Sequence, residues 1–313
     1  MNRTIFSAGV ALICCALQIE AAPKKETASK KGGDPGGHVE KAEQLAREGQ
    51  FDAAIAEMNN AIEAKGSATN YNNRGNIYRA AQKLQEAVAD YSKAIELDPK
   101  DAVAYFERGQ TQIMLKQYDP ALVDLDKAIA IRPTEAAFFR NRGFADIGKF
   151  DYGRALEDFS KAIELDPKDA VSYERRGLAN RSLRNYDAAI ADYSKSLELN
   201  PNDGETWARR GYTFTFLGQY EKAIADYEQA MKVNPNDTET PQRLLYAKSQ
   251  LAQRNAAPPA PTVAATPTPT PKGMSPITIG LGILVGIVVI VIIGIMAMRR
   301  RPLPVDEDSR RIR

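Results

Sequence analysis

The sequence predicts an all-α protein, in which stacked helix pairs form a solenoid and one further helix spans a membrane. The first observation behind this prediction is an Arg-Gly dipeptide that returns every 34 residues. It occurs at Arg74-Gly75, Arg108-Gly109, Arg142-Gly143, Arg176-Gly177 and Arg210-Gly211. The second is that apolar residues between the dipeptides recur at the helical spacing i, i+3, i+4 and i+7. The third is an uncharged stretch of 22 residues, 277–298.

Five units of 34 residues, numbered from Ala68, Ala102, Ala136, Ala170 and Gly204, share a constant set of residues. Position 4 is always aromatic: Tyr71, Tyr105, Phe139, Tyr173 and Trp207. Position 20 is always alanine and position 32 always proline. We expect one helix over positions 2–14 and a second over 18–31, which the proline ends because the residue before a proline avoids the helical region. Small residues at positions 8, 20 and 27 allow the two helices to approach closely.

The constant residues resemble the pattern of tetratricopeptide repeats. The resemblance covers 68–101, 102–135, 136–169, 170–203 and 204–237, and 38–67 reads as a divergent copy in which Ala42 and Met58 keep the spacing. It implies a right-handed superhelix of helix pairs with a concave, partner-binding face and no catalytic activity. Position 7 departs from the family, which usually has leucine there, because it is arginine in all five units.

The arginine at position 7 has a constant companion, an aspartate at position 23. The pairs are Arg74 and Asp90, Arg108 and Asp124, Arg142 and Asp158, Arg176 and Asp192, and Arg210 and Asp226. Both positions flank the packed positions 8 and 24 on facing helices, so we expect each arginine to pair with an aspartate. The pair forms either within a unit or across to the next one. The expected role is structural, a ladder of ion pairs along the solenoid.

The resemblance places positions 2, 5, 6, 9, 12 and 13 of the first helix on the concave face, and these positions vary between units. The candidate peptide-binding residues are Asn72, Asn76, Phe106, Gln110, Arg140, Phe144, Arg175, Leu178, Arg209 and Tyr212. The middle of the face is apolar and also includes Ile113, Met114 and Ile147. Arginines in the later units suggest a partner segment with apolar anchors and an acidic end. The alternative is an ordinary solvated face.

The N-terminal 22 residues have the composition of a secretory signal peptide, with Arg3 before an apolar run and small residues at its end. A lipoprotein signal at Cys14 or Cys15 is the alternative. Residues 23–37 are rich in Lys, Gly and Ser, which predicts a flexible lead-in. His38, near the start of the divergent copy, is expected to be a solvated or capping residue.

The C-terminal part of the sequence predicts that the protein is anchored in a membrane. A capping helix over 238–254 is followed by a Pro/Thr-rich linker, 255–276, and a transmembrane helix, 277–298. Gly282 and Gly286 have the spacing with which two such helices pack, so a homodimer is possible. The tail, 299–313, begins with three arginines and is therefore placed in the cytoplasm. The repeats would then lie on the outer side of the inner membrane, in the periplasm of a bacterium.

Composition argues against several function classes. The formal net charge is +2, which gives no basic excess for nucleic acid. The chain has one histidine, and its two cysteines lie in the predicted signal peptide, so we expect no metal site, no cofactor and no enzyme. The leading prediction is a scaffold that binds other proteins at the membrane. The alternative is a structural spacer or oligomerisation element of a membrane complex.

Overall fold

A computed structural model describes residues 34–256 of the 313-residue chain. The predicted signal peptide, the lead-in up to residue 33, and the linker, transmembrane helix and tail from residue 257 onward lie outside the described residues. The chain divides into two units, 1–202 and 203–313. Each unit is described by itself.

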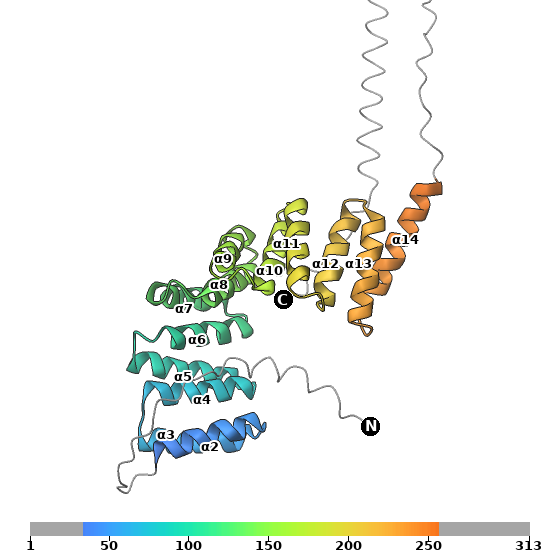
Figure 1. The fold of residues 1–313 in the computed structure, drawn as a ribbon. Coiled ribbons are helices and arrows are strands. Elements are labelled where there is room, and N and C mark those ends of the chain that lie inside the picture. Colours follow the sequence, from blue (N-terminus) through green and yellow to red (C-terminus); the bar gives the residue numbers. More distant parts are fainter. Residues whose placement is uncertain (1–33, 257–313) are drawn as a thin grey trace, which may run out of the picture. The chain divides into compact units, whose positions relative to one another are not determined.

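The described part of the first unit consists of ten α-helices and that of the second unit of three (Figure 1). In the first unit these are α2 (Pro35–Arg47), α3 (Phe51–Ala64), α4 (Ala68–Ala80), α5 (Leu84–Leu97), α6 (Ala102–Met114), α7 (Tyr118–Ile131), α8 (Ala136–Gly148), α9 (Tyr152–Leu165), α10 (Ala170–Ser182) and α11 (Tyr186–Leu199). In the second they are α12 (Gly204–Phe216), α13 (Tyr220–Val233) and α14 (Thr240–Ala256).

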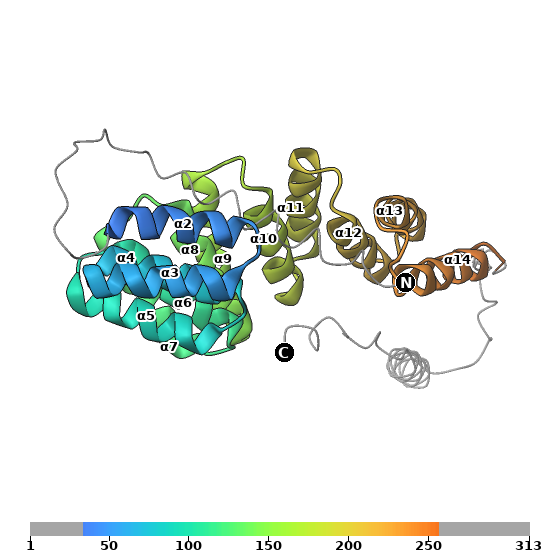
Figure 2. The same ribbon diagram turned by 90° about the horizontal axis from the view of Figure 1, so that it is seen from below.

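In the first unit, each even-numbered helix packs against the odd-numbered helix that follows it, and each pair packs against the next pair. We call the first member of a pair helix A and the second helix B. The A helices of neighbouring pairs also contact one another, α4 with α6, α6 with α8 and α8 with α10. The side chains on this side of the A helices form a common surface, which we call the helix-A face. The stacking of the pairs can be followed in Figures 1 and 2.

The helices begin one position earlier than the sequence predicts, at positions 1 and 17 of each 34-residue unit rather than 2 and 18. For most A helices the residue before position 1 caps the helix, although Glu135, before α8, makes no such bond. Asp101 accepts a hydrogen bond from the Val103 N–H, and Asp169 accepts one from the Val171 N–H. Such a side chain satisfies one of the free N–H groups of the first turn, so the helix starts directly after it.

Close contact between helix A and helix B depends on the glycine at position 8. A Cβ atom on Gly75 would lie 2.7 Å from the ring of Tyr91, and one on Gly143 would lie 2.9 Å from the ring of Phe159. Both rings are fully buried. The glycine therefore lets the helix backbone pack directly on the aromatic ring at position 24, which supplies much of the buried apolar surface of a repeat.

The turn between the two helices places position 15 in the left-handed region. Lys116 has a φ of 59° and Phe150 a φ of 62°, whereas Gly49 and Gly218 occupy the same position in other repeats. A left-handed conformation costs a residue with a side chain roughly 1 kcal/mol. The backbone compensates with two hydrogen bonds that close the turn, from Lys116 N to Ile113 O and from Gln117 N to Gln112 O.

The pair α2–α3 forms a repeat despite its missing Arg-Gly dipeptide. Its helix A begins at Pro35, three residues before the expected start at His38. Ala42, Ala54 and Met58 are fully buried in one cluster with Ile77 of α4. His38 lies against α3, with its Nδ1 2.6 Å from Glu57 Oε2. Lys41 and His38 together lower the pKa of Glu57 to about 2.

In the second unit, α14 repeats the start of α12. Asp203 accepts hydrogen bonds from the backbone N–H and the hydroxyl of Thr206. Asp237 accepts a hydrogen bond from the hydroxyl of Thr240, and both threonines are almost fully buried. The predicted capping helix is therefore the helix A of a further repeat. Within residues 34–256, every helix is too short or too polar to cross a membrane.

Candidate protein-interaction face

The constant arginine of each repeat binds the constant aspartate of the same repeat through two parallel hydrogen bonds. In the first of the five repeats, Nε and Nη2 of Arg74 lie 2.7 Å from the two carboxylate oxygens of Asp90. The guanidinium carbon of Arg74 also lies 5.5 Å from the ring centre of Tyr71, at position 4. A bidentate pair of this kind fixes both side chains, so helix A and helix B of one repeat are held together.

The third nitrogen of the same arginine reaches the preceding repeat. Nη1 of Arg74 donates to Asn59 at 2.7 Å, and Nη1 of Arg108 donates to Ser92 at 2.9 Å. The sequence left open whether the arginine acts within a repeat or between repeats. In the first unit it does both, because the flat guanidinium presents donors on two sides. These residues therefore position the helix-A face and do not belong to it.

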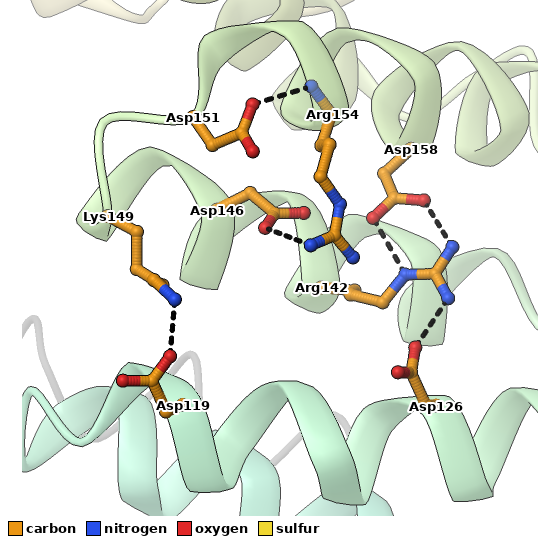
Figure 3. A network of polar contacts seen from close by, with 8 residues as sticks. All are labelled: Asp119, Asp126, Arg142, Asp146, Lys149, Asp151, Arg154 and Asp158. Carbon is orange, nitrogen blue, oxygen red and sulfur yellow. Dashed lines mark hydrogen bonds and ion pairs between the residues drawn. The ribbon is translucent and has the colours of Figure 1, made fainter.

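The repeat of α8 and α9 has a denser charge network, shown in Figure 3. Here Nη1 of Arg142 meets a second carboxylate, Asp126, at 2.7 Å, in addition to Asp158. Asp158 and then Asp126 raise the pKa of Arg142 above its ordinary value. Asp146 lies close by and is 1% exposed, yet neither of its carboxylate oxygens accepts a hydrogen bond from the described residues.

The nearest cation to Asp146 is Arg154, whose Nη1 lies 3.9 Å from Oδ1. Burial raises the pKa of Asp146 to about 6, an effect that Arg154 opposes. Sequence reasoning missed this residue. The signal was present, because position 11 is aromatic in two other repeats, at Tyr78 and Phe214, which marks it as a buried position.

The α4 part of the helix-A face is polar and internally bonded. Asn72, 8% exposed, donates to Asp101 at 2.8 Å, and Asn76 accepts a hydrogen bond from the Tyr91 hydroxyl at 2.7 Å. Arg79 lies 2.7 Å from Glu107 and also donates to Gln110 on α6. Of the predicted binding residues, Gln110 is tied to the preceding repeat through Arg79, Asn76 is bonded within its own repeat, and Asn72 donates to Asp101 while its Oδ1 has no hydrogen-bond partner among the described residues.

The α6 part of the face is an apolar stripe. Val103, Phe106, Ile113 and Met114 fall on one side of this helix, because residues three, four and seven apart share a face. The ring of Phe106 lies 4.8 Å from that of Phe138 on α8. Val103 is 38% exposed and Met114 47% exposed, although both are apolar. We call Val103, Phe106, Ile113 and Met114 the α6 stripe.

The arginines of α8 and α10 are balanced by carboxylates. Arg140 Nη1 lies 2.9 Å from Asp169, and Arg175 Nε lies 2.8 Å from Glu174. The Arg175 guanidinium also stacks over the ring of Phe144 at 5.4 Å. Their charge is therefore compensated within the face. Leu178, expected to contact a partner, is 1% exposed and does not present its side chain at the surface.

In the second unit the two predicted binding residues are likewise engaged. Arg209 forms an ion pair with Glu205 one turn earlier in α12. The ring of Tyr212 lies 5.4 Å from the guanidinium carbon of Arg243 on α14. Within this unit, Arg210 again binds Asp226 through two hydrogen bonds of 2.8 Å and stacks on Trp207.

Two exposed residues of the α6 stripe, Val103 and Met114, were not among the ten candidate binding residues, although their positions were expected on the concave face and Met114 was named there. They stand at positions 2 and 13, close to the ends of helix A. The helical period places both residues on this face, but it does not report how far the neighbouring repeats cover them, so their exposure comes from the structure alone.

Comparison with known proteins agrees with the repeat structure. A family model described as "TPR repeat" matches residues 75–116. A second, described as "Tetratricopeptide repeat", matches 170–203 and 204–237, which are the bounds of the units numbered from Ala170 and Gly204. A curated relative, an ancillary SecYEG translocon subunit of Neisseria gonorrhoeae, is 34% identical over 59 residues. That match covers 19% of this chain and 28% of the relative, less than a third of its length.

Solved structures with the same fold include YrrB, described as a TPR protein with an unusual peptide-binding site. It is 24% identical, with a TM-score of 0.51 over 61% of this chain and 97% of its own. PilF of Pseudomonas aeruginosa is 16% identical, with a TM-score of 0.59 over 69% of this chain and 97% of its own. At these identities the likeness concerns the fold. The chain therefore contains tetratricopeptide repeats, which form an all-α helical solenoid.

Proposed function

We propose that the repeats bind a segment of a partner protein along the helix-A face of the first unit, and that the α6 stripe is the main contact. Tetratricopeptide repeats generally mediate protein–protein interaction, and the curated relative is named as a subunit of a translocon. The observation that carries the proposal is the exposure of Val103 and Met114 on a face whose charged neighbours are already paired.

The chemistry of the face favours apolar anchors in the partner. Covering an exposed apolar side chain contributes about 25 cal/mol for each Å² removed from water. The arginines contribute less, because Arg140 and Arg175 already have carboxylate partners and would have to exchange them. We therefore assign the affinity to Val103, Phe106 and Met114. An acidic end of the partner should add less to the affinity than these apolar contacts.

Site-specific photocrosslinking in the native membrane tests this function. A photoreactive residue replaces Val103 or Met114 in the full-length chain, and, as a matched control, Val123 on α7, an exposed valine on a helix B. We expect one discrete adduct from positions 103 and 114 and none from 123. The same adducts should disappear when Val103→Asp is combined with the probe at 114. Equal labelling from 123, or no adduct from either α6 position, contradicts the proposal.

We also propose that the repeats lie outside the cytoplasm and are tethered by residues 277–298. Support comes from the sequence alone: the signal-like N-terminus, the uncharged 22-residue stretch and the arginines that follow it. Alkaline extraction of membranes should leave the protein in the pellet. A phosphatase reporter fused after residue 256 should be active, and the same reporter fused after residue 313 should be inactive. Release by alkali, or the reverse reporter pattern, excludes this placement.

A further inference from the structure

The last described helix, α14, is a helix A without a helix B. It keeps the register of the repeats: Asp237 and Thr240 stand 34 residues after Asp203 and Thr206. It packs on α13 and contacts α12, as a helix A of the next repeat does. The residues after Ala256 are Pro- and Thr-rich and have no helical apolar period. The side of α14 that would receive a helix B is therefore left exposed by the described chain.

This side of α14 is not built for an ordinary helix B. Position 8 is glycine in the five full repeats, where the ring or leucine side chain of position 24 packs directly on the backbone. In α14 the corresponding residue is Leu245, which is 70% exposed. A leucine side chain fills the space that an aromatic ring of helix B would need. Another repeat of the same kind therefore does not fit here, and a different occupant is required.

The exposed face of α14 carries no charge over its whole length. Placing its residues at 100° intervals gives one face made of Pro241, Gln242, Leu245, Tyr246, Ser249, Ala252, Gln253 and Ala256. Tyr246 is 49% exposed. The three cations of the helix lie outside this face and are paired: Arg243 with Glu239, the half-exposed Lys248 with Glu228 at 3.0 Å, and Arg254 with Glu221.

The outer face of α2, the first described helix, shows what a solvated end of this solenoid looks like. Its exposed residues include Glu40, Lys41, Arg47 and Glu48. Terminal repeats of solenoids normally present such a polar surface to water. The uncharged face of α14 departs from this rule, and it belongs to a chain in which 26% of the residues are charged.

We propose that the exposed face of α14 binds the same face of a second copy of this chain, with the two helices antiparallel and the two-fold axis near Ser249. The two halves of the face are complementary in size. Leu245 and Tyr246 occupy the first half, whereas Ala252 and Ala256 occupy the second. In an antiparallel pair centred on Ser249, Tyr246 of one copy lies opposite Ala252 of the other and Gln242 lies opposite Ala256, so large side chains meet small ones there, while Leu245 lies opposite Gln253.

A partner of different sequence fits the face less specifically, since nothing charged on it selects one. A single pair of helices buries less than the roughly 1,200 Å² typical of a stable free complex. The contact is therefore weak in solution and depends on both copies being held in one membrane, where a tether raises their effective concentration. Residues 277–298, predicted to span the membrane, supply that tether.

Disulfide crosslinking of the full-length protein in membranes tests the contact. Cys14 and Cys15 are first changed to alanine, and Ser249→Cys is introduced at the expected axis. Mild oxidation should give a covalent dimer at least tenfold more abundant than from Gln44→Cys, an exposed position on α2 that serves as the matched control. Adding Leu245→Glu to Ser249→Cys should lower the dimer yield at least tenfold.

Because Leu245 is mostly exposed, Leu245→Glu should leave the thermal melting of the helices unchanged, which separates loss of contact from loss of folding. Three results overturn the proposal. The first is equal dimer from Ser249→Cys and Gln44→Cys. The second is an unchanged yield with Leu245→Glu, which would mean that another region alone, such as Gly282 and Gly286, brings the copies together. The third is a Ser249→Cys adduct with a protein of different mass.

Discussion

The neighbouring repeats 102–135 and 136–169 contain the same arginine–aspartate pair, which we call the clamp, but the residues around the clamp differ. In both, the arginine at position 7 binds the aspartate at position 23 through two hydrogen bonds. In the first, the third nitrogen of Arg108 meets the neutral Ser92. In the second, the third nitrogen of Arg142 meets Asp126, and Asp146 is buried beside the pair without a hydrogen bond from the described residues.

This difference shows how a repeat protein varies without losing its fold. The constant positions carry the packing and the clamp, so the variable positions are free to change in chemistry. The repeat of α6 and α7 places apolar residues at the surface, where we propose that they contact a partner. The repeat of α8 and α9 places charge next to the core, where it makes stability depend on pH.

Removing the aspartate of the clamp should have the largest effect and should differ between the two repeats. Asp124→Asn leaves the Arg108 guanidinium half-buried with only neutral neighbours, which should lower the free energy of unfolding by about 3 kcal/mol. Asp158→Asn should cost about 1 kcal/mol less, because Asp126 still faces Arg142. Urea denaturation followed by circular dichroism measures both. Equal losses would show that Asp126 contributes nothing.

The next largest effect should come from the ionisation of Asp146. Most carboxylates in folded proteins stabilise the fold as pH rises, whereas Asp146 should destabilise it. Its pKa is raised from 3.8 to about 6, so between these pH values the folded chain holds a proton that the unfolded chain has lost. The free energy of unfolding should therefore fall as pH rises through this window, by up to about 3 kcal/mol, and stay low above it.

Asp146→Asn should remove that fall. The variant should be more stable than the parent at pH 7 and similar to it at pH 4, in melting curves recorded across the range. Asp119→Asn, at an exposed position of the same network, is the matched control and should follow the parent. A variant less stable than the parent at pH 7 would falsify the assignment of Asp146 as a carboxylate whose charge is destabilised by burial.

Asp126→Asn should have the smallest effect. The Asp126 side chain is about half exposed, so its ion pair with Arg142 should contribute roughly 0.2–1 kcal/mol and weaken with added salt. In the double variant Asp126→Asn/Asp158→Asn, the loss should exceed the sum of the two single losses, because Arg142 then has no carboxylate. Strict additivity in this cycle would mean that the two aspartates act independently.

The repeats themselves were readable from the sequence, because five residues recur at fixed spacing and each has one physical role. The glycine at position 8 and the aromatic residue at position 24 imply close helix contact, and Gly75 and Tyr91 show that contact. For most A helices the start was displaced by one residue because the capping role of position 34 was overlooked. That role depends on a hydrogen bond between Asp101 and Val103, two residues apart, which apolar periodicity does not report.

The binding residues were harder to predict. The sequence indicates which side of helix A varies, but not which variable side chains are exposed. Asn72 and Leu178 proved to be buried, whereas Val103 and Met114 are exposed. Exposure depends on how far the neighbouring repeat covers each position, and that coverage follows from packing.

By itself the sequence determined the repeat, its period and the pairing of an arginine with an aspartate, because each of these depends on residue types at fixed spacing. The tertiary structure decided three further points. It directed the third nitrogen of Arg108 to the preceding repeat, buried Asp146 without a hydrogen bond, and left the face of α14 around Leu245 uncovered. Each of these points depends on how the helices pack. Packing sets the distances between residues that are far apart in the sequence, and the sequence spacing does not report those distances.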